Sequence, residues 1–297
     1  VKDIQRFLDS RVPNCNASPT SPGCLKDFTM DIPATPASEG RCSAIEARTK
    51  ASAAQAIYDV ARACGINPRV ILVTLQKEQG LVTSTNPTEY KYRAAMGMSC
   101  PDSNPAQCGK VDGGFFQQLY KGAGQLQWYN DPRGSFTYLK VGRTITRPLH
   151  PNASCGTQSF VLKSAATAAL YYYTPYVPNK AALDNLYSTG NSCSSYGNRN
   201  FWRFYTDWFG DPIGGGFLLK SSQSDTYLIV DGKKYLIDDV DTIAAMKPLG
   251  PLGTVSQAYL DSFVDSGKAS RLVKSPALGN YYFIDGGQKY KFTNCTQ

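Results

Sequence analysis

The sequence predicts a mainly α-helical first domain followed by a smaller α+β module built from β-hairpins. Three observations support this fold class. A capped apolar helix covers residues 68–79, an alanine-rich stretch precedes it from residue 43, and a repeat with an offset of 54–55 residues occupies the C-terminal part. Because 297 residues exceed the usual length of one domain, we expect at least two domains.

The N-terminal 42 residues combine a short amphipathic helix with a loop rich in Pro, Ser and Cys. Ile4 and Leu8 indicate the helix because they lie four residues apart, on one face. From Ser43 the alanine-rich stretch predicts a long helix that ends at Gly65. A second helix over residues 68–79 follows directly, so we expect the two to form an antiparallel helical hairpin.

The second of these helices ends on a lone carboxylate, Glu78. Asn67 suits the N-cap, Pro68 suits the first helical position, and Gly80 suits the left-handed position after the helix. Leu75 lies three residues before Glu78, on the same apolar face. An apolar surround and the negative end of the helix dipole both disfavour the charged form of a carboxyl. Glu78 is therefore a candidate general acid; the alternative is a water-exposed glutamate at the helix end.

Three further helices complete the first domain, which we predict to cover residues 43–210. One begins near Gly114, one covers about 164–173, and the last holds the aromatic residues of segment 201–209. Aromatic side chains surround the axis of the last helix, which predicts a buried closing helix. A glycine-rich linker follows at 211–216.

Residues 217–297 contain the internal repeat. Each copy predicts a β-hairpin with an Asp-Gly turn, at Asp231-Gly232 and again 54 residues later. Helical stretches around 242–246 and 254–263 join the copies. We interpret the second copy as truncated and the module as a cell-wall-binding element; the alternative is a spacer or a platform for subunit contacts.

Nine cysteines in an otherwise ordinary composition indicate an oxidising, extracytoplasmic location. Cysteines close in sequence are the natural partners, and Cys295 is left over. The expected disulfides are Cys15–Cys24, Cys42–Cys64, Cys100–Cys108 and Cys155–Cys193. There is one histidine, His150, and no Cys-x-x-Cys array, so a zinc site is poorly supported and no cofactor is predicted.

The net charge of +8 favours anionic surroundings. The lysines and arginines are scattered and match no nucleic-acid motif, so nucleic acid is not a predicted partner. No stretch is long and apolar enough to span a membrane. The sequence therefore predicts a secreted protein that is associated with an anionic cell wall, with its leader already removed.

Three short motifs follow one another in the first domain: Leu72–Glu78, Gly114–Gln117 and Leu170–Pro175. In this order they resemble the motifs of the lysozyme-like superfamily, which includes lytic transglycosylases and goose-type lysozymes. Region 43–210 is also similar to secreted actinobacterial proteins of unassigned role. The chain departs from the superfamily at Gln79, where a serine is usual.

The resemblance implies a lysozyme-like helical fold and a groove that binds a glycan. By the same resemblance, Glu78 would protonate the leaving oxygen and then act as a base, while Tyr171 would hydrogen-bond Glu78 and hold it in place. Phe116 and Gln117 would line the groove.

Other side chains could also bind a sugar chain. Tyr172 and Tyr176 belong to a tyrosine cluster whose rings could stack on sugars, although some of its members must pack in the core. Asp102, in the loop between Cys100 and Cys108, could lie across the groove from Glu78; the alternative is an Asx turn that starts the loop.

These inferences combine into one functional hypothesis: a secreted enzyme that cleaves the β-1,4 glycan of peptidoglycan with Glu78 as general acid/base. The alternative is a non-catalytic glycan-binding or structural cell-surface protein that retains the groove.

Overall fold

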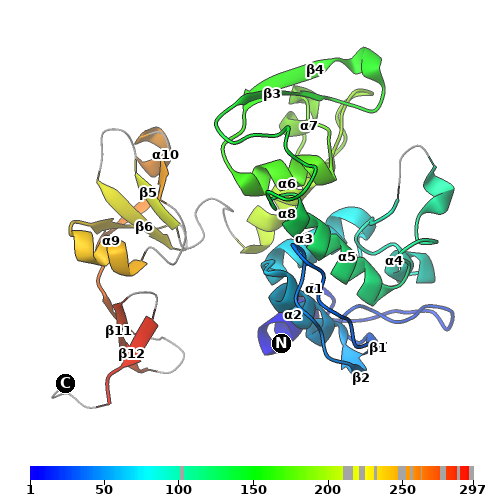
Figure 1. Ribbon diagram of the computed structural model, residues 1–297, viewed down its shortest axis with the longest axis horizontal. Helices are drawn as coiled ribbons and strands as arrows, with labels where there is room; N and C mark the ends of the chain where they lie inside the picture. Colours follow the sequence, from blue (N-terminus) through cyan, green and yellow to red (C-terminus); the bar gives the residue numbers. More distant parts are fainter. Residues whose placement is uncertain are drawn as a thin grey trace. The chain divides into compact units, whose positions relative to one another are not determined.

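The computed structural model divides the chain into two compact units, Val1–Tyr205 and Thr206–Gln297. The fold is mixed α+β, with 37% of the described residues in helices and several small sheets (Figure 1). The predicted mainly α class therefore holds only as a leaning. The described residues are 1–100, 104–209, 217–220, 225–230, 233–246, 252–254, 257–261, 263–274, 279–285 and 288–293.

Helices are the main regular elements of the first unit. They are α1 (Lys2–Arg11), α2 (Ala53–Cys64), α3 (Pro68–Gln79), α4 (Glu89–Arg93), α5 (Phe115–Trp128), α6 (Ala165–Tyr173), α7 (Lys180–Asp184) and α8 (Gly197–Phe209), with the short 3₁₀ helices η1 (Pro105–Gln107) and η2 (Ala153–Cys155). Two antiparallel strand pairs accompany them: β1 (Thr29–Ile32) with β2 (Arg48–Ser52), and β3 (Thr144–Pro148) with β4 (Thr157–Val161).

The central core of the first unit forms where α2 packs against α3 and α5. The side chains of Ile57, Ile71 and Leu75 are fully buried there. The predicted bounds of α3 are confirmed, because the Asn67 side chain accepts from the Arg69 amide and Gly80 adopts the left-handed conformation. This core fixes the C-terminal end of α3, which carries Glu78.

The expected helix from Ser43 to Gly65 is wrong over residues 43–52, nearly half of its length. Residues 48–52 form β2, in which Ala51 pairs with Met30 of β1. The helix begins only at Ala53, because the Ser52 side chain accepts from the Gln55 amide and caps it. Pairing with a distant strand has overridden the helix propensity of the alanine-rich segment.

Residues 132–183, here named the β3–β4 lobe, have a small core of their own. Leu139, Ile145, Leu162 and Ala168 form this buried cluster beneath the hairpin of β3 and β4. The Cys155–Cys193 disulfide ties η2, between the two strands, to the segment before α8. The β3–β4 hairpin of the lobe is therefore tied to the rest of the first unit at its η2 end (Figure 1).

The aromatic helix α8 differs from its prediction. Phe201 is buried in it, whereas Trp202 is 45% exposed. The expected burial on all sides is therefore wrong. Arg199, also buried, donates to three carbonyls, those of Ala182, Asn185 and Ser188, so a charged side chain takes part of the packing face.

The second unit consists of two small sheets. One has the strand order β8-β5-β6-β7-β9 and the other β10-β11-β12. The strands are β5 (Phe217–Lys220), β6 (Thr226–Val230), β7 (Lys233–Ile237), β8 (Gly253–Thr254), β9 (Val264–Lys268), β10 (Leu272–Lys274), β11 (Tyr281–Asp285) and β12 (Gln288–Lys291); the helices are α9 (Val240–Met246) and α10 (Gln257–Asp261).

Both predicted repeat hairpins are confirmed as antiparallel pairs, β6 with β7 and β11 with β12. Asp231, Gly232 and Gly286 of the predicted turns lie outside the described residues. The two predicted helical stretches correspond to α9 and α10. In the part of the chain that the structure describes, no helix combines the length and the apolar character needed to cross a membrane.

All four expected disulfides are present: Cys15–Cys24, Cys42–Cys64, Cys100–Cys108 and Cys155–Cys193. All of them lie in the first unit. Cys295 lies outside the described residues.

Candidate binding cleft

Glu78 lies at the mouth of a cleft, and its nearest charged neighbour is a cation. The Nζ atom of Lys77 is 2.5 Å from Glu78 Oε1, and the two side chains are 6% and 24% exposed. Lys77 also donates to the Thr174 hydroxyl at 2.9 Å. The apolar surround expected for Glu78 is therefore wrong, because an ion pair with a buried lysine takes its place.

The cleft beside this ion pair has a volume of about 700 Å³. Its walls come from the end of α3, the disulfide-closed loop before α5, and the segment after α6. Three tyrosines from separate elements face it. The lining residues are Lys77, Glu78, Gln79, Tyr90, Gly97, Cys100, Cys108, Tyr173, Thr174, Pro175, Tyr196, Gly197 and Asn200.

A second hollow of about 430 Å³ continues the cleft. The two share Gly97, Cys100 and Tyr173, and the second extends past Tyr129 and Val111. We call the two together the tyrosine cleft. Volumes of this size lie within the usual range of ligand sites.

Tyr173 forms the junction between the two halves of the tyrosine cleft. Its hydroxyl donates to the Met96 carbonyl at 2.5 Å, and the Lys77 Nζ lies 5.4 Å from the centre of its ring. Burial raises the pKa of Tyr173, and the negative charge of Glu78 raises it further. The hydroxyl therefore remains protonated and acts as a fixed donor to the loop.

Gln118 fixes the 96–98 loop, of which Gly97 and Met98 line the tyrosine cleft. Its Oε1 accepts from the amides of Met96 and Met98 at 3.1 and 3.0 Å. Its Nε2 donates to the carbonyls of Met98 and Asp112 at 3.0 and 2.8 Å. All of its usual hydrogen-bonding capacity is used inside the protein, so the loop from 96 to 98 has one defined position.

Gly97 allows Glu78 to approach this loop. It has a φ of +69°, and a Cβ atom placed on it would lie 2.9 Å from Glu78 Oε2. A side chain at this position would meet both a backbone penalty and a steric one. The sequence signal was a glycine between two methionines, which carries no functional meaning by itself.

Most of the predicted site residues lie elsewhere. Of those that the structure describes, Glu78 alone lines the tyrosine cleft. Tyr171 packs on Phe160 against the small core of the β3–β4 lobe. The Tyr172 hydroxyl accepts from the Leu139 amide, and the Tyr172 ring stacks on Tyr129.

The remaining predicted residues are placed as follows. Phe116 is buried, and Gln117 is half-buried beside the fully bonded Gln118. Tyr176 is half-buried, and its carbonyl accepts from the Asn198 side chain. Asp102 lies outside the described residues.

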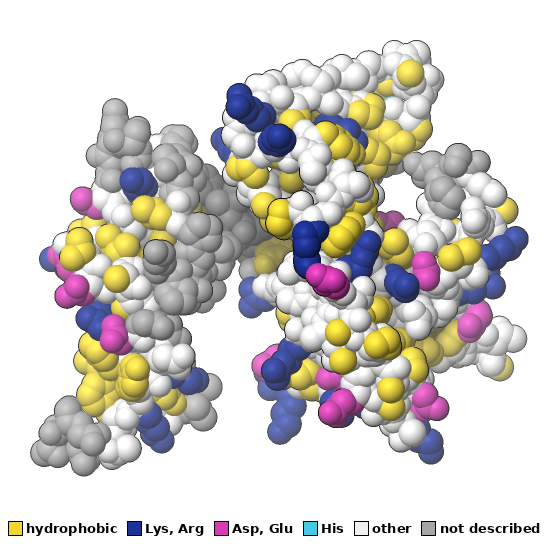
Figure 2. Space-filling model, in the orientation of Figure 1, with side chains coloured by type: hydrophobic (Ala, Val, Ile, Leu, Met, Phe, Trp, Pro, Cys, Tyr) yellow, Lys and Arg dark blue, Asp and Glu magenta, His cyan; other side chains and the backbone are white. Residues whose placement is uncertain are grey.

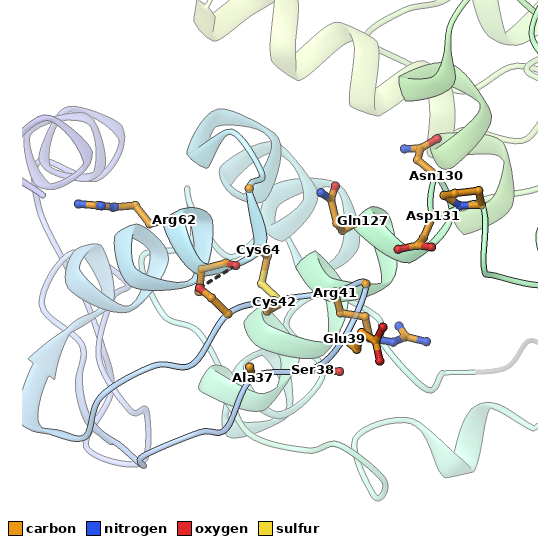
Figure 3. A pocket seen from close by; sticks show the side chains of 15 residues that line it. Ala37, Ser38, Glu39, Arg41, Cys42, Arg62, Cys64, Gln127, Asn130 and Asp131 are labelled. Carbon is orange, nitrogen blue, oxygen red and sulfur yellow. Dashed lines mark hydrogen bonds between the residues drawn. A yellow bond between two sulfur atoms is a disulfide. The ribbon is translucent and has the colours of Figure 1, made fainter.

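A different pocket of about 630 Å³ lies beside the Cys42–Cys64 disulfide (Figure 3). Glu39, Arg41 and Asp131 gather toward one end of it, and Arg62 extends outward at the other. Arg133 pairs with both Glu39 and Asp131, and its side chain is 53% exposed. We call this the disulfide pocket. The cation of its ion pairs is half exposed, whereas the Asp131 side chain is 11% exposed.

Among the described residues, no group of three or more His, Cys, Asp or Glu side chains is placed to hold a metal ion.

A family model matches most of this chain. The family model described as "LasA, N-terminal domain" matches residues 2–220, which is more than half of the chain. No curated protein and no solved structure matches. LasA is a staphylolytic, M23 peptidase-associated protein.

This match corrects the functional hypothesis. The resemblance to the lysozyme-like superfamily is wrong, and so is the glycan-cleaving enzyme, glycosidase or lytic transglycosylase, that it implied. The physical reason is that the three motifs are ordinary helix ends: Glu78 and Gly80 close α3, Gly114 precedes α5, and Tyr171 packs in a core. The disulfides together with the family match indicate an extracellular protein. This chain belongs to the family of the LasA N-terminal domain.

Proposed function

We propose that this chain is a non-catalytic, wall-associated accessory domain that binds peptidoglycan or a related cell-wall glycan in the tyrosine cleft. The observation that carries the proposal is the cleft itself. It has the size of a ligand site, it has a buried ion pair at its edge, and four tyrosines line it: Tyr90, Tyr129, Tyr173 and Tyr196.

The chemistry of the lining suits a sugar chain. Tyrosine rings offer apolar faces for sugar rings, while their hydroxyls bond to water or to the ligand. Tyr90 is 43% exposed and available for such stacking. Lys77 and Glu78 present a donor and an acceptor at one edge, which could bind the hydroxyl and amide groups of an N-acetylated sugar.

The family match supports the wall as the location of the ligand. LasA is described as staphylolytic, so that protein acts on bacterial cells. A domain of the same family would then hold a peptidase-associated protein on its polymer. The net charge of +8 also favours an anionic wall.

Sedimentation with insoluble peptidoglycan tests this proposal. The glycan should be freed of covalently attached anionic polymers, so that the measurement reports the sugar and peptide network alone. Wild type should sediment with it, and Tyr90→Ala should weaken binding about tenfold, since loss of one stacking contact of roughly 1.4 kcal/mol corresponds to that factor.

Tyr187→Ala is the matched control. It removes another exposed tyrosine of the same unit that lines neither part of the tyrosine cleft, so its binding should equal that of wild type. The double variant Tyr90→Ala/Gln79→Ala should bind more weakly still. Wild-type binding by all three variants would overturn the proposal, as would a failure of wild type to sediment.

A further inference from the structure

The β3–β4 lobe has an unusual distribution of charge. Between Asp131 and Asp184 the sequence holds no acidic residue over 52 positions. Six basic residues lie in the same interval, against a net charge of +8 for the whole chain. They are Arg133, Lys140, Arg143, Arg147, Lys163 and Lys180.

Three of these cations are brought together at the open end of the hairpin. The Gly142 amide donates to the Leu162 carbonyl at 2.8 Å, and the Leu162 amide donates to the Arg143 carbonyl at 3.0 Å. Leu162 is thus bonded to the turn that contains Lys140 and Arg143. Lys163 is the next residue after Leu162, so it lies beside that turn. We call Lys140, Arg143 and Lys163 the lobe cations.

The lobe cations are exposed, and each of the two lysines stands next to a leucine that is buried. Leu139 and Leu162 belong to the small core of the lobe, whereas Lys140 and Lys163 next to them face water. Among the described residues, no carboxylate forms an ion pair with any lobe cation. Figure 2 shows dark blue side chains gathered at one end of this part of the surface.

The outer face of the hairpin adds hydroxyl groups beside this charge. Thr146 pairs with Ser159 across the strands, and their hydroxyls are 2.7 Å apart. Thr144 precedes them on the same face, because alternate residues of a strand share a face. The opposite face carries Ile145 and Phe160, which pack on the small core. The outer face of the hairpin thus presents hydroxyls beside the cations, together with Val161, which pairs with Thr144 and is 50% exposed.

The frame that carries these groups is constrained on three sides. The Cys155–Cys193 disulfide fixes η2, and the Arg147 Nε donates to the Pro175 carbonyl at 3.2 Å. Ser164, next to Lys163, caps α6, so the positive end of that helix dipole adds to the local field. A preorganised surface loses little entropy when it binds a polymer.

We propose that the outer face and open end of the β3–β4 lobe form a second binding surface, for a polyol-phosphate polymer of the kind attached to cell walls. Repeated phosphodiester anions match the lobe cations, and polyol hydroxyls match the row of Thr and Ser side chains. A lipid surface would require a cluster of large apolar side chains that insert, whereas on this face Val161 stands beside the hydroxyls of Thr146 and Ser159.

The test measures binding to purified poly(glycerol phosphate) at several salt concentrations. Wild type should bind, and its affinity should fall as ionic strength rises. The triple variant Lys140→Gln/Arg143→Gln/Lys163→Gln should lose at least tenfold in affinity and most of the salt dependence. The control Lys2→Gln/Lys50→Gln/Arg69→Gln removes the same charges from exposed positions outside the lobe and should bind like wild type.

Two results would overturn this inference. One is equal affinity of the lobe triple variant and its charge-matched control. The other is tighter binding of wild type to phosphatidylglycerol vesicles than to the polymer, which would make the lobe a membrane surface. Because the polymer is absent from the stripped glycan used for Tyr90→Ala, the tyrosine cleft and the lobe can fail separately.

Discussion

The tyrosine cleft and the disulfide pocket are similar in volume and differ in the exposure of the cations beside them. The main part of the first holds about 700 Å³ and the second about 630 Å³. Lys77 in the first is 6% exposed, whereas Arg133 at the second is 53% exposed. Volume alone therefore does not distinguish a binding site. Buried polar groups do, because only there does the loss of one partner leave another unsatisfied.

The largest effect on stability should come from replacing Gln118, which fixes the 96–98 loop beside the tyrosine cleft. Gln118→Leu removes four hydrogen bonds and leaves backbone groups of the 96–98 loop and Asp112 without partners. We expect a loss of roughly 4 kcal/mol in the free energy of unfolding, measured with urea. Gln117→Leu is the adjacent control and should change stability by less than about 0.5 kcal/mol. Equal losses of stability in the two variants would mean that the 96–98 loop does not depend on the Gln118 side chain.

A glycine series compares the two sites directly. Gly40, beside the disulfide pocket, has a φ of +68°, and an added Cβ would lie 2.5 Å from Asp131 Oδ2 and 2.7 Å from the Trp128 ring. We expect Gly40→Ala to cost about 3 kcal/mol and Gly97→Ala about 2, because the Glu78 side chain can move aside. Gly142→Ala, with positive φ and open space, should cost about 1 kcal/mol. Any other order in thermal unfolding would contradict this steric account.

Removal of one cation from each site contrasts buried and exposed ion pairs. Lys77→Met leaves Glu78 without its partner and should cost about 2 kcal/mol, less than for a fully buried pair because Glu78 is 24% exposed. The double variant Lys77→Met/Glu78→Gln should recover most of this loss. Arg133→Met should cost less than Lys77→Met, because the Arg133 side chain is 53% exposed. If the double variant does not regain this stability, the loss in Lys77→Met arises from altered packing rather than from the unpaired charge of Glu78.

The smallest effect concerns pH at the disulfide pocket. Hydrogen bonds from Arg133 lower the pKa of Asp131 from 3.8 to about 2. Because the folded-state pKa is depressed, the stabilising contribution is fully present above pH 3.8 and is lost as pH falls through 2. The stability difference between wild type and Asp131→Asn should therefore shrink over that window. In an Arg133→Met background the same substitution should show no such dependence.

Local signals in the sequence predicted local structure well. Asn67, Pro68 and Gly80 determined both ends of α3, since caps act within one helical turn. Cysteines close in sequence predicted all four disulfides in the described chain. The strand β2 was not predicted because its partner, β1, lies about twenty residues earlier in the chain, and no sequence pattern within 48–52 indicates this pairing.

The candidate site was harder to predict, because it depends on which of several similar residues faces inward. Tyr171, Tyr172 and Tyr173 are consecutive, so a helix points them in directions about 100° apart. Tyr173 faces the cleft, and Tyr171 faces the lobe core. A motif match cannot resolve that rotation. The same holds for Gln117 and Gln118, of which the second holds the loop.

The three motifs misled for a related reason. A glutamate before a glycine and a glycine before an aromatic helix start are common solutions to ending and beginning a helix. Their order along a helical chain is therefore weak information about chemistry. The family match covers 219 residues, from 2 to 220, and draws on far more positions than these motifs do.

The order in which cysteines pair has a consequence for biogenesis. Eight cysteines can be paired in 105 ways. In the observed arrangement they pair two by two in chain order, with sequence separations of 9, 22, 8 and 38 residues. No bond encloses or crosses another. As the polypeptide emerges into an oxidising space, each thiol meets its proper mate before the following pair arrives. Maturation can thus proceed vectorially, with little need for reshuffling by an isomerase.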